Sequence, residues 1–338
     1  MQIGIFGAGA IGSFLGTRLS ASGQAVRLLA RANVVEVADE LRATDRGGTT
    51  VHAKNLTASE DPEVLRGVDI CLVTVKSQDT PEVARALAEL LGPEALVVSF
   101  QNGLDNARRL GAAVSGTAVQ GIVTYNVYRE TAAETRQATS GKLVVGKAPG
   151  ARAKLTFLVD ALRQAGETVE VAEDIDGEVA GKLLINLNNG VCAATGLRIA
   201  DSLGNRKARW CFAECIAEGS RVFARAGIRP ISPFALPLPI IARTLKLPNA
   251  VVMRVARGLA SVAPTAKSST LQDLERGRTT EIADLNGAIV RLAGDHNVPC
   301  PANRTVVDAV RAHEASVLEN LPIHFVKPAA LKARIRTR

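Results

Sequence analysis

A short apolar segment carries polar side chains at helical spacing. In "AGKLLINLNNG", residues 180–190, Lys182, Asn186 and Asn189 stand at positions i, i+4 and i+7 among leucine and isoleucine. At 3.6 residues per turn they share one face of a helix, while the apolar residues fill the rest of its circumference. Polar groups on a largely buried helix need water, a partner or a ligand. Helical phase places Asn188 away from the stripe.

A second group of polar residues lies in "SSTLQDLERGRTTEIADLNG", residues 268–287. We predict a helix over 279–297, in which Glu281 would share the apolar face with Leu285 and Ile289. A carboxylate there could act in catalysis. It could equally stabilise the positive end of the helix dipole after two threonines.

The amino terminus has the pattern expected of a phosphate-binding loop. "FGAGAIGS" contains Gly7, Gly9 and Gly12 as G-x-G-x-x-G, directly after a predicted strand and before a predicted helix. Such glycines permit a tight turn, close approach of a pyrophosphate and close helix–strand packing. We therefore predict dinucleotide binding through the loop residues, which are Gly7, Ala8, Gly9, Ala10, Ile11 and Gly12.

The end of the second predicted strand favours NADPH as the dinucleotide. "VRLLARAN" ends without the acidic residue that usually holds the ribose of NAD, and it offers Arg31, with Arg27 nearby. An arginine can pair with a 2′-phosphate. An ordinary surface arginine is the alternative interpretation. Two further strands end in polar residues, at Lys76 and Asn102, where ligands bind in open α/β sheets; solvated loop residues are the alternative interpretation of both.

The order of predicted elements gives the fold class. Apolar runs alternate with helical segments in the first half of the chain, which is typical of an α/β protein with a doubly wound, Rossmann-type sheet. One strand is expected over 117–128. From about residue 173 the periodicity is helical throughout, including 251–260. We predict a dinucleotide-binding domain over 1–172, an all-helical domain over 173–326 and a basic tail over 327–338.

Composition excludes several other classes of protein. The net charge is +8 over 338 residues, but five basic residues lie in the tail, and aromatic residues make up only 3%; nucleic-acid binding is therefore not expected. No signal peptide or membrane span is found. The five cysteines form no CxxC pair, so we expect no metal site and a reducing, cytoplasmic location. We expect the tail to be a frayed, solvated end.

With these residues in place, the chain resembles the ketopantoate reductase family (2-dehydropantoate 2-reductases). The resemblance extends over nearly the whole length, because "FGAGAIGS", Arg31, "VTVKS", "SFQNG", "GKLLIN" and residues 268–287 follow in the family's order. It implies a Rossmann domain, a helical domain and an active site in the cleft between them. It also implies that NADPH reduces ketopantoate, a 2-keto acid, to pantoate for pantothenate and coenzyme A synthesis.

The resemblance implies roles for single residues. Lys182 matches the catalytic lysine that donates a proton to the keto oxygen, and Glu281 matches the acid that orients the substrate and tunes that lysine. The remaining matches are residues for cofactor or substrate, namely Lys76, Asn102, Asn186, Asn189, and Ser268 or Ser269. Two alternatives stay open: a reductase of another 2-keto acid or of an opine-type imine, and a non-catalytic NADPH-binding regulator. A homodimer is one oligomeric state that the sequence allows.

Overall fold

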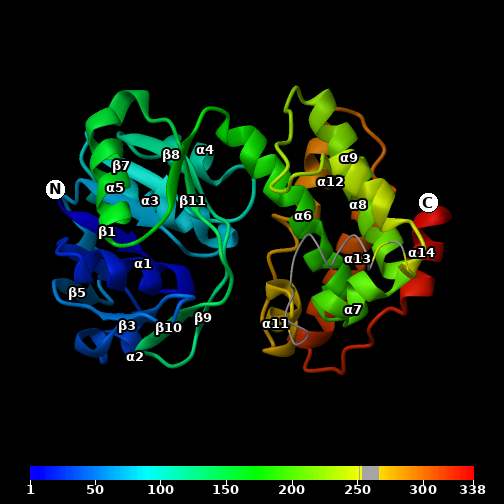
Figure 1. Ribbon diagram of the computed structural model, residues 1–338, viewed down its shortest axis with the longest axis horizontal. Coiled ribbons are helices and arrows are strands. Elements are labelled where there is room, and N and C mark those ends of the chain that lie inside the picture. The colour runs from blue at the N-terminus through cyan, green and yellow to red at the C-terminus, as the bar shows by residue number, and fades with distance from the viewer. Residues whose placement is uncertain (251, 253–265) are drawn as a thin grey trace. The chain divides into compact units, whose positions relative to one another are not determined.

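The computed structural model describes residues 1–250, 252 and 266–338. The chain divides into two compact units, Met1–Ile175 and Asp176–Arg338, which are coloured from blue to green and from green to red in Figure 1. The strands lie in the first unit, and the second unit is helical. No helix among the described residues is long and apolar enough to cross a membrane.

A mixed, mostly parallel sheet forms the centre of the amino-terminal unit. Within the described residues it has eight strands in the order β12-β11-β8-β7-β6-β1-β2-β5, and the only antiparallel pair in it is β8 with β11. The strands are β1 (Ile3–Phe6), β2 (Val26–Leu29), β5 (Leu56–Ser59), β6 (Ile70–Val73), β7 (Leu96–Ser99), β8 (Thr117–Val123), β11 (Leu143–Gly146) and β12 (Val169–Ala172). This confirms the predicted α/β class.

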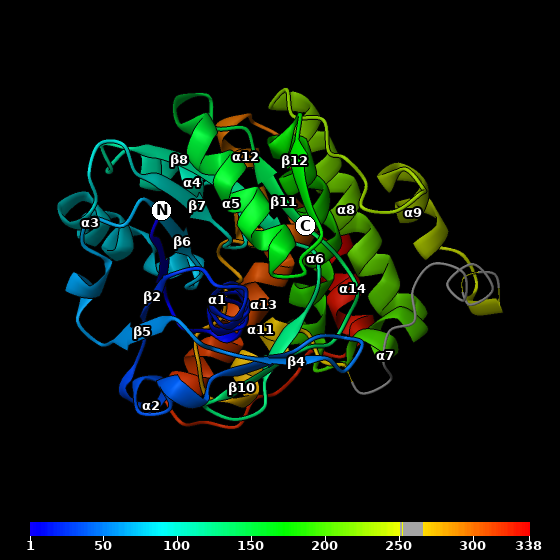
Figure 2. The same ribbon diagram turned by 60° about the vertical axis from the view of Figure 1, so that its left-hand side comes forward.

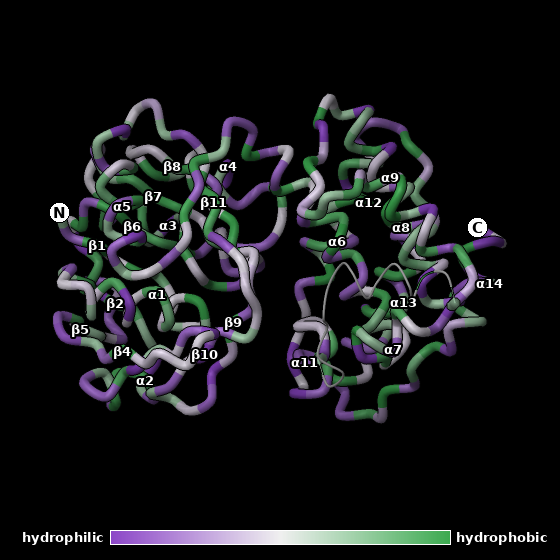
Figure 3. Tube along the Cα trace, in the orientation of Figure 1, coloured by the Kyte–Doolittle hydropathy of each residue, from purple (hydrophilic) through white to green (hydrophobic). Residues whose placement is uncertain are grey.

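Helices cover both faces of this sheet. They are α1 (Ala10–Ala21), α2 (Ala32–Val35), α3 (Thr80–Leu90), α4 (Asn106–Gly111) and α5 (Arg152–Gln164), with short 3-10 turns between some of them. Strand β6 shows how the faces are shared: Ile70 and Leu72 belong to the core cluster that contains α1 and α5, whereas Cys71 and Val73 belong to the cluster that contains α3 and α4. Because both faces are buried, the strand is apolar at every position. Figure 3 shows hydrophobic colour along the strands in the middle of this unit and hydrophilic colour mainly in its loops.

A second, smaller sheet was not predicted. Its order is β4-β3-β10-β9, and its strands are β3 (Arg42–Thr44), β4 (Thr50–His52), β9 (Val127–Arg129) and β10 (Glu134–Gln137). It packs against α1, and Figures 1 and 2 show it at the lower edge of the unit. The single strand predicted over 117–128 is wrong, because the chain leaves β8 at Val123 and enters β9 in the other sheet. These strands are only three or four residues long and mostly polar, so they show no alternation of apolar and polar residues from which a strand could be predicted.

The carboxy-terminal unit is helical. Its helices are α6 (Ile175–Thr195, whose first residue closes the first unit), α7 (Ile199–Gly204), α8 (Arg206–Arg225), α9 (Leu238–Leu245), α11 (Ser269–Glu275), α12 (Asn286–Asp295), α13 (Pro301–Leu318) and α14 (Pro328–Arg336). Apart from Val252, the helix predicted over 251–260 lies outside the described residues. The predicted connection in the Pro-rich segment is present before α9.

The prediction that residues 327–338 form a frayed, solvated tail is wrong. Residues 328–336 form α14, which packs on α8 with Leu331 and Ile335 buried at positions i and i+4. Lys332 and Arg336 lie over the ring of Trp210, at 4.8 and 5.2 Å from its centroid. The apolar pair and the cation–π contacts fix a segment that its charge alone made look solvated.

Candidate active site

The glycine-rich loop joins β1 to α1, as predicted. Gly7 has φ +103°, and a Cβ there would lie 2.3 Å from Val75 Cγ1; at Gly12 it would lie 2.0 Å from the carbonyl oxygen of Gly7. The protein's own packing therefore requires both glycines. At Gly9 a Cβ would meet only the Thr74 carbonyl oxygen, at 3.8 Å, which is ordinary contact. Gly9 therefore leaves open space beside the first turn of α1, where backbone N–H groups suit an anion.

The two arginines of the second strand have different surroundings. Arg27 donates from Nη1 to the carbonyl oxygens of Val64 and Arg66, at 3.3 and 3.0 Å, so its guanidinium serves to hold the loop there. Arg31 follows the end of β2 and is exposed. Its guanidinium has no hydrogen-bond or ion-pair partner among the residues that the structure describes. Of this pair, Arg31 is the arginine that a 2′-phosphate could reach.

A buried polar network joins the loops that carry Lys76 and Asn102. Gln101 Nε2 donates to the Lys76 carbonyl oxygen at 3.3 Å, and Asn106 Nδ2 donates to the Asn102 carbonyl oxygen at 2.5 Å and to Ser77 Oγ at 2.9 Å. The ends of β6 and β7 therefore present these two residues from one rigid framework. Sequence reasoning missed the supporting glutamine and Asn106. The glutamine stands beside Asn102 in "SFQNG", which was the available signal.

On α6 the predicted polar stripe is present. Lys182, Asn186 and Asn189 are half-buried, whereas most of their apolar neighbours are fully buried. Asn188 is buried and accepts a hydrogen bond from Ser202 Oγ at 3.0 Å, which confirms that it points away from the stripe. The amides of Asn186 and Asn189 have no hydrogen-bond partner within the described residues. That the stripe contacts a substrate stays a prediction.

The loop before α9 reaches α6 beside Lys182. The Ile231 N–H donates to the Gly177 carbonyl oxygen at 2.8 Å. A Cβ at Gly181 would lie 1.6 Å from the Ile231 carbonyl oxygen, so only glycine permits this approach. The glycine that precedes Lys182 therefore lets a second backbone close over this side of the helix and limits access of water to it.

Lys182 and Glu281 interact electrostatically. Burial lowers the pKa of Lys182 to about 8, and the Glu281 carboxylate opposes that decrease. An amine with a pKa near 8 is mostly protonated at neutral pH and still gives up its proton readily. This combination is suited to a general acid.

The local structure around Glu281 differs from the prediction. Helix α12 begins at Asn286, so Glu281 lies in the turn before it and not on its apolar face. The turn is fastened by Glu314 of α13, whose Oε1 accepts bonds from the Thr280 N–H and Oγ1, each at 2.7 Å. Thr280 Oγ1 also accepts from the Ile282 N–H at 3.1 Å. Sequence reasoning missed Glu314, because nothing in "RAHEASV" indicates which backbone it binds.

The two serines have different positions. Ser268 is buried and caps α11: its Oγ accepts from the Leu271 N–H at 3.2 Å and donates to the Asn189 carbonyl oxygen at 3.4 Å. Ser269 is exposed. Ser268 therefore connects α11 to α6. Of the two serines, only the exposed Ser269 could contact a ligand. Among the described residues, no group of three or more His, Cys, Asp or Glu side chains is placed to hold a metal ion.

Fold and site together define the class. A Rossmann-type unit with a glycine-rich loop between its first strand and first helix, followed by a helical unit with a lysine–carboxylate pair, is an organisation of two-domain oxidoreductases. Family models agree: residues 3–150 match "Ketopantoate reductase PanE/ApbA" and residues 174–314 match its C-terminal part. The chain belongs to the ketopantoate reductase family.

Individual relatives support this assignment over the full length. A 2-dehydropantoate 2-reductase of Halobacterium salinarum is 32% identical, covering 92% of this chain and 98% of that protein. The crystal structure of a PanE/ApbA family ketopantoate reductase from Ralstonia eutropha superposes with a TM-score of 0.81 at 29% identity, covering 94% of this chain and all of that one. A ternary structure of D-mandelate dehydrogenase with NADH and anilino(oxo)acetate shares the fold, with a TM-score of 0.76 at 24% identity and coverage of 94% and 100%.

Proposed function

We propose that this protein is an NADPH-dependent reductase that converts 2-dehydropantoate to pantoate, a reaction of pantothenate and coenzyme A synthesis in the cytoplasm. The observation on which the proposal rests is the half-buried Lys182, with a pKa of about 8 and the Glu281 carboxylate acting on it. Reduction of a carbonyl group produces a developing alkoxide that needs a proton. The Lys182 ammonium could supply that proton, and the Glu281 carboxylate favours the charged form of the lysine.

Cofactor binding is assigned to the amino-terminal unit. The open space at Gly9 and the first turn of α1 fit a pyrophosphate, and the exposed Arg31 fits a 2′-phosphate. Lys76 and Asn102, held by one network, would bind the nicotinamide end or the substrate. When bound, the cofactor supplies the hydride.

Substrate binding and proton transfer are assigned to α6 and the turn before α12. The Lys182 ammonium hydrogen-bonds the keto oxygen and donates its proton to it, while Glu281 holds that ammonium in its charged form. Asn186, Asn189 and Ser269 offer amide and hydroxyl groups to the polar groups of the substrate.

A substrate panel tests the proposal. Purified protein is mixed with NADPH or NADH and with 2-dehydropantoate, other branched 2-keto acids, an aromatic 2-keto acid, or a 2-keto acid plus an amino acid, and the loss of reduced cofactor is followed by absorbance. We expect the highest kcat/KM with 2-dehydropantoate and NADPH. A higher value for another acid or for an imine would change the substrate but keep the chemistry. Binding of NADPH without turnover of any acid would favour a regulator.

A further inference from the structure

Arg129, on a strand of the small sheet, holds the carbonyl side of the glycine-rich loop. Its Nη2 donates to the Ala8 carbonyl oxygen at 2.6 Å and to the Gly9 carbonyl oxygen at 3.3 Å. The same nitrogen contacts Ser13 Oγ, which donates to the Ala8 carbonyl oxygen at 3.2 Å. Residues 120 positions apart in the chain therefore meet at the loop.

These contacts fix the direction of the neighbouring N–H groups. In a trans peptide the C=O of one residue and the N–H of the next point in opposite directions in one plane. Because Arg129 holds the carbonyls of Ala8 and Gly9, the N–H groups of Gly9 and Ala10 point away from it. Those are the groups at the open side of Gly9 and at the start of α1. A loop fixed in this way loses little freedom when an anion binds.

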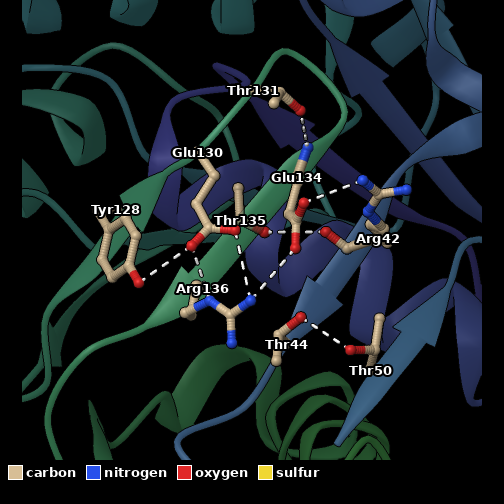
Figure 4. Close-up of polar contacts among 9 residues, drawn as sticks. All are labelled: Arg42, Thr44, Thr50, Tyr128, Glu130, Thr131, Glu134, Thr135 and Arg136. Atoms are coloured by element: carbon tan, nitrogen blue, oxygen red, sulfur yellow. Dashed lines mark hydrogen bonds and ion pairs between the residues drawn. The ribbon is translucent and has the colours of Figure 1, made fainter. Parts of the chain in front are cut away.

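The guanidinium itself is held rigidly. Nη1 of Arg129 donates to the Ala132 carbonyl oxygen within the turn between β9 and β10. Around that turn, Arg136 pairs with Glu130 at 2.8 Å, and Arg42 of β3 pairs with Glu134 at 3.0 Å, as Figure 4 shows. Thr131 Oγ1 accepts from the Glu134 N–H at 3.1 Å. Partial burial lowers the pKa of Arg129, yet a guanidinium stays charged under all conditions in which proteins fold.

We propose that Arg129 is a positioning residue for the pyrophosphate of the dinucleotide, and that the small sheet serves as its support. This inference rests on the proposed binding of a dinucleotide and extends it. Arg129 presents the loop N–H groups and adds a fixed positive charge behind them, without a direct part in the chemistry. An anchor that merely joined β9 to α1 would affect every ligand of the unit equally.

The test compares ligands that contain the pyrophosphate with ligands that lack it. R129M removes the charge and the hydrogen bonds but keeps an apolar stem, and R129K keeps the charge without the planar fork. R66M is the matched control, because Arg66 is an exposed arginine of the same unit outside the small sheet, and its guanidinium binds Glu63 and the Glu89 carbonyl oxygen. Dissociation constants are measured for NADPH by fluorescence and for 2′-AMP by competition; NADH and adenosine replace them if the wild-type protein prefers NADH.

For R129M we expect NADPH to bind about 10- to 100-fold more weakly, the range for lost hydrogen bonds to a charged group, with 2′-AMP affinity within about 2-fold of wild type. R129K should lie between R129M and wild type, and R66M should match wild type for both ligands. Two results would overturn the positioning role of Arg129 without affecting the proposed function. One is an unchanged NADPH affinity in R129M. The other is an equal loss of affinity for NADPH and 2′-AMP in an R129K variant whose circular dichroism shows an intact fold. A wild-type protein that binds no dinucleotide would overturn the proposed function first.

Discussion

The charge of Glu281 should control the pH dependence of the reaction through Lys182. Glu281→Gln keeps the shape of the side chain and removes the charge that raises the pKa of Lys182, which burial has already lowered to about 8. Loss of a nearby opposite charge changes a pKa by about 1 to 3, so a change of about 1.5, in the lower half of that range, gives the variant lysine a pKa of about 6.5. Because a general acid must be protonated, the rate falls as pH rises through the pKa, and this fall moves to lower pH.

The size of the effect follows from the protonated fraction. At pH 8 the wild-type lysine is about half protonated and the variant lysine about 3%, a difference of about 15-fold, whereas at pH 5.5 both are about 90% protonated or more. The assay is kcat/KM for the preferred 2-keto acid, measured from pH 5.5 to pH 9 with saturating cofactor. A loss of substrate orientation would multiply every point by the same factor, so the ratio between the two pH values isolates the electrostatic effect. A parallel, unshifted profile would refute the reasoning.

Three further changes test the rest of the site. Lys182→Met should reduce kcat by orders of magnitude while NADPH affinity stays within about 2-fold. Folding lowers the pKa of the wild-type Lys182 amine from 10.5 to about 8, so this amine destabilises the folded protein, most strongly below pH 8. Thermal unfolding should therefore show K182M more stable than wild type by about 1 to 3 kcal/mol at pH 7, and this difference should disappear towards pH 10.5. Arg31→Ala should weaken NADPH by about 10-fold or more and leave NADH unchanged in steady-state KM values; an equal loss for both would place the 2′-phosphate elsewhere. Glu314→Ala should release Thr280 and shift the pH profile in the same direction as E281Q but less, whereas a lower melting temperature with an unmoved profile would leave Glu314 a structural role only.

Local patterns predicted the parts of this protein that depend on local structure. Most strands of the large sheet were found because burial on both faces makes runs such as Ile70–Val73 continuously apolar. The edge strand β5 was missed, because none of its residues is fully buried and its sequence is less apolar. The glycine-rich loop was found because the spacing of its three glycines is contained in six consecutive residues, although the contact that requires Gly7 is with the distant Val75. The Lys182 stripe was found because helical phase is a property of the segment itself.

Contacts between distant segments account for what was missed. Strand β10 pairs with β3 across about ninety residues, with only three to four residues in each strand, so no window of sequence reveals it. The turn at Glu281 depends on Glu314, which stands 34 residues from Thr280 on another helix. The strong helix formers after Thr280 predicted that a helix begins there. In the structure, hydrogen bonds to Glu314 hold this segment as a turn, and the helix begins only at Asn286. Arg129 was missed for the same reason, because the glycine-rich loop that it contacts lies 120 residues away in the sequence.

The asparagines of α6 show why a polar residue on an apolar helix is not by itself evidence of a site. Asn188 is as polar as its neighbour, yet the protein satisfies it with Ser202 and buries it. Asn186 and Asn189 keep their amides half-buried and without a partner among the described residues. An unsatisfied amide that is fully buried costs about 1 to 3 kcal/mol, and a half-buried amide carries part of that cost, so retaining two of them on one stripe with a lysine of lowered pKa is a cost that function must offset. On this reasoning Asn186→Leu should stabilise the fold and raise KM for the keto acid, whereas Asn188→Leu should destabilise the fold and leave KM unchanged. Thermal unfolding and steady-state kinetics on this pair would separate the two kinds of asparagine, and a loss of stability in Asn186→Leu would show that the stripe is structural.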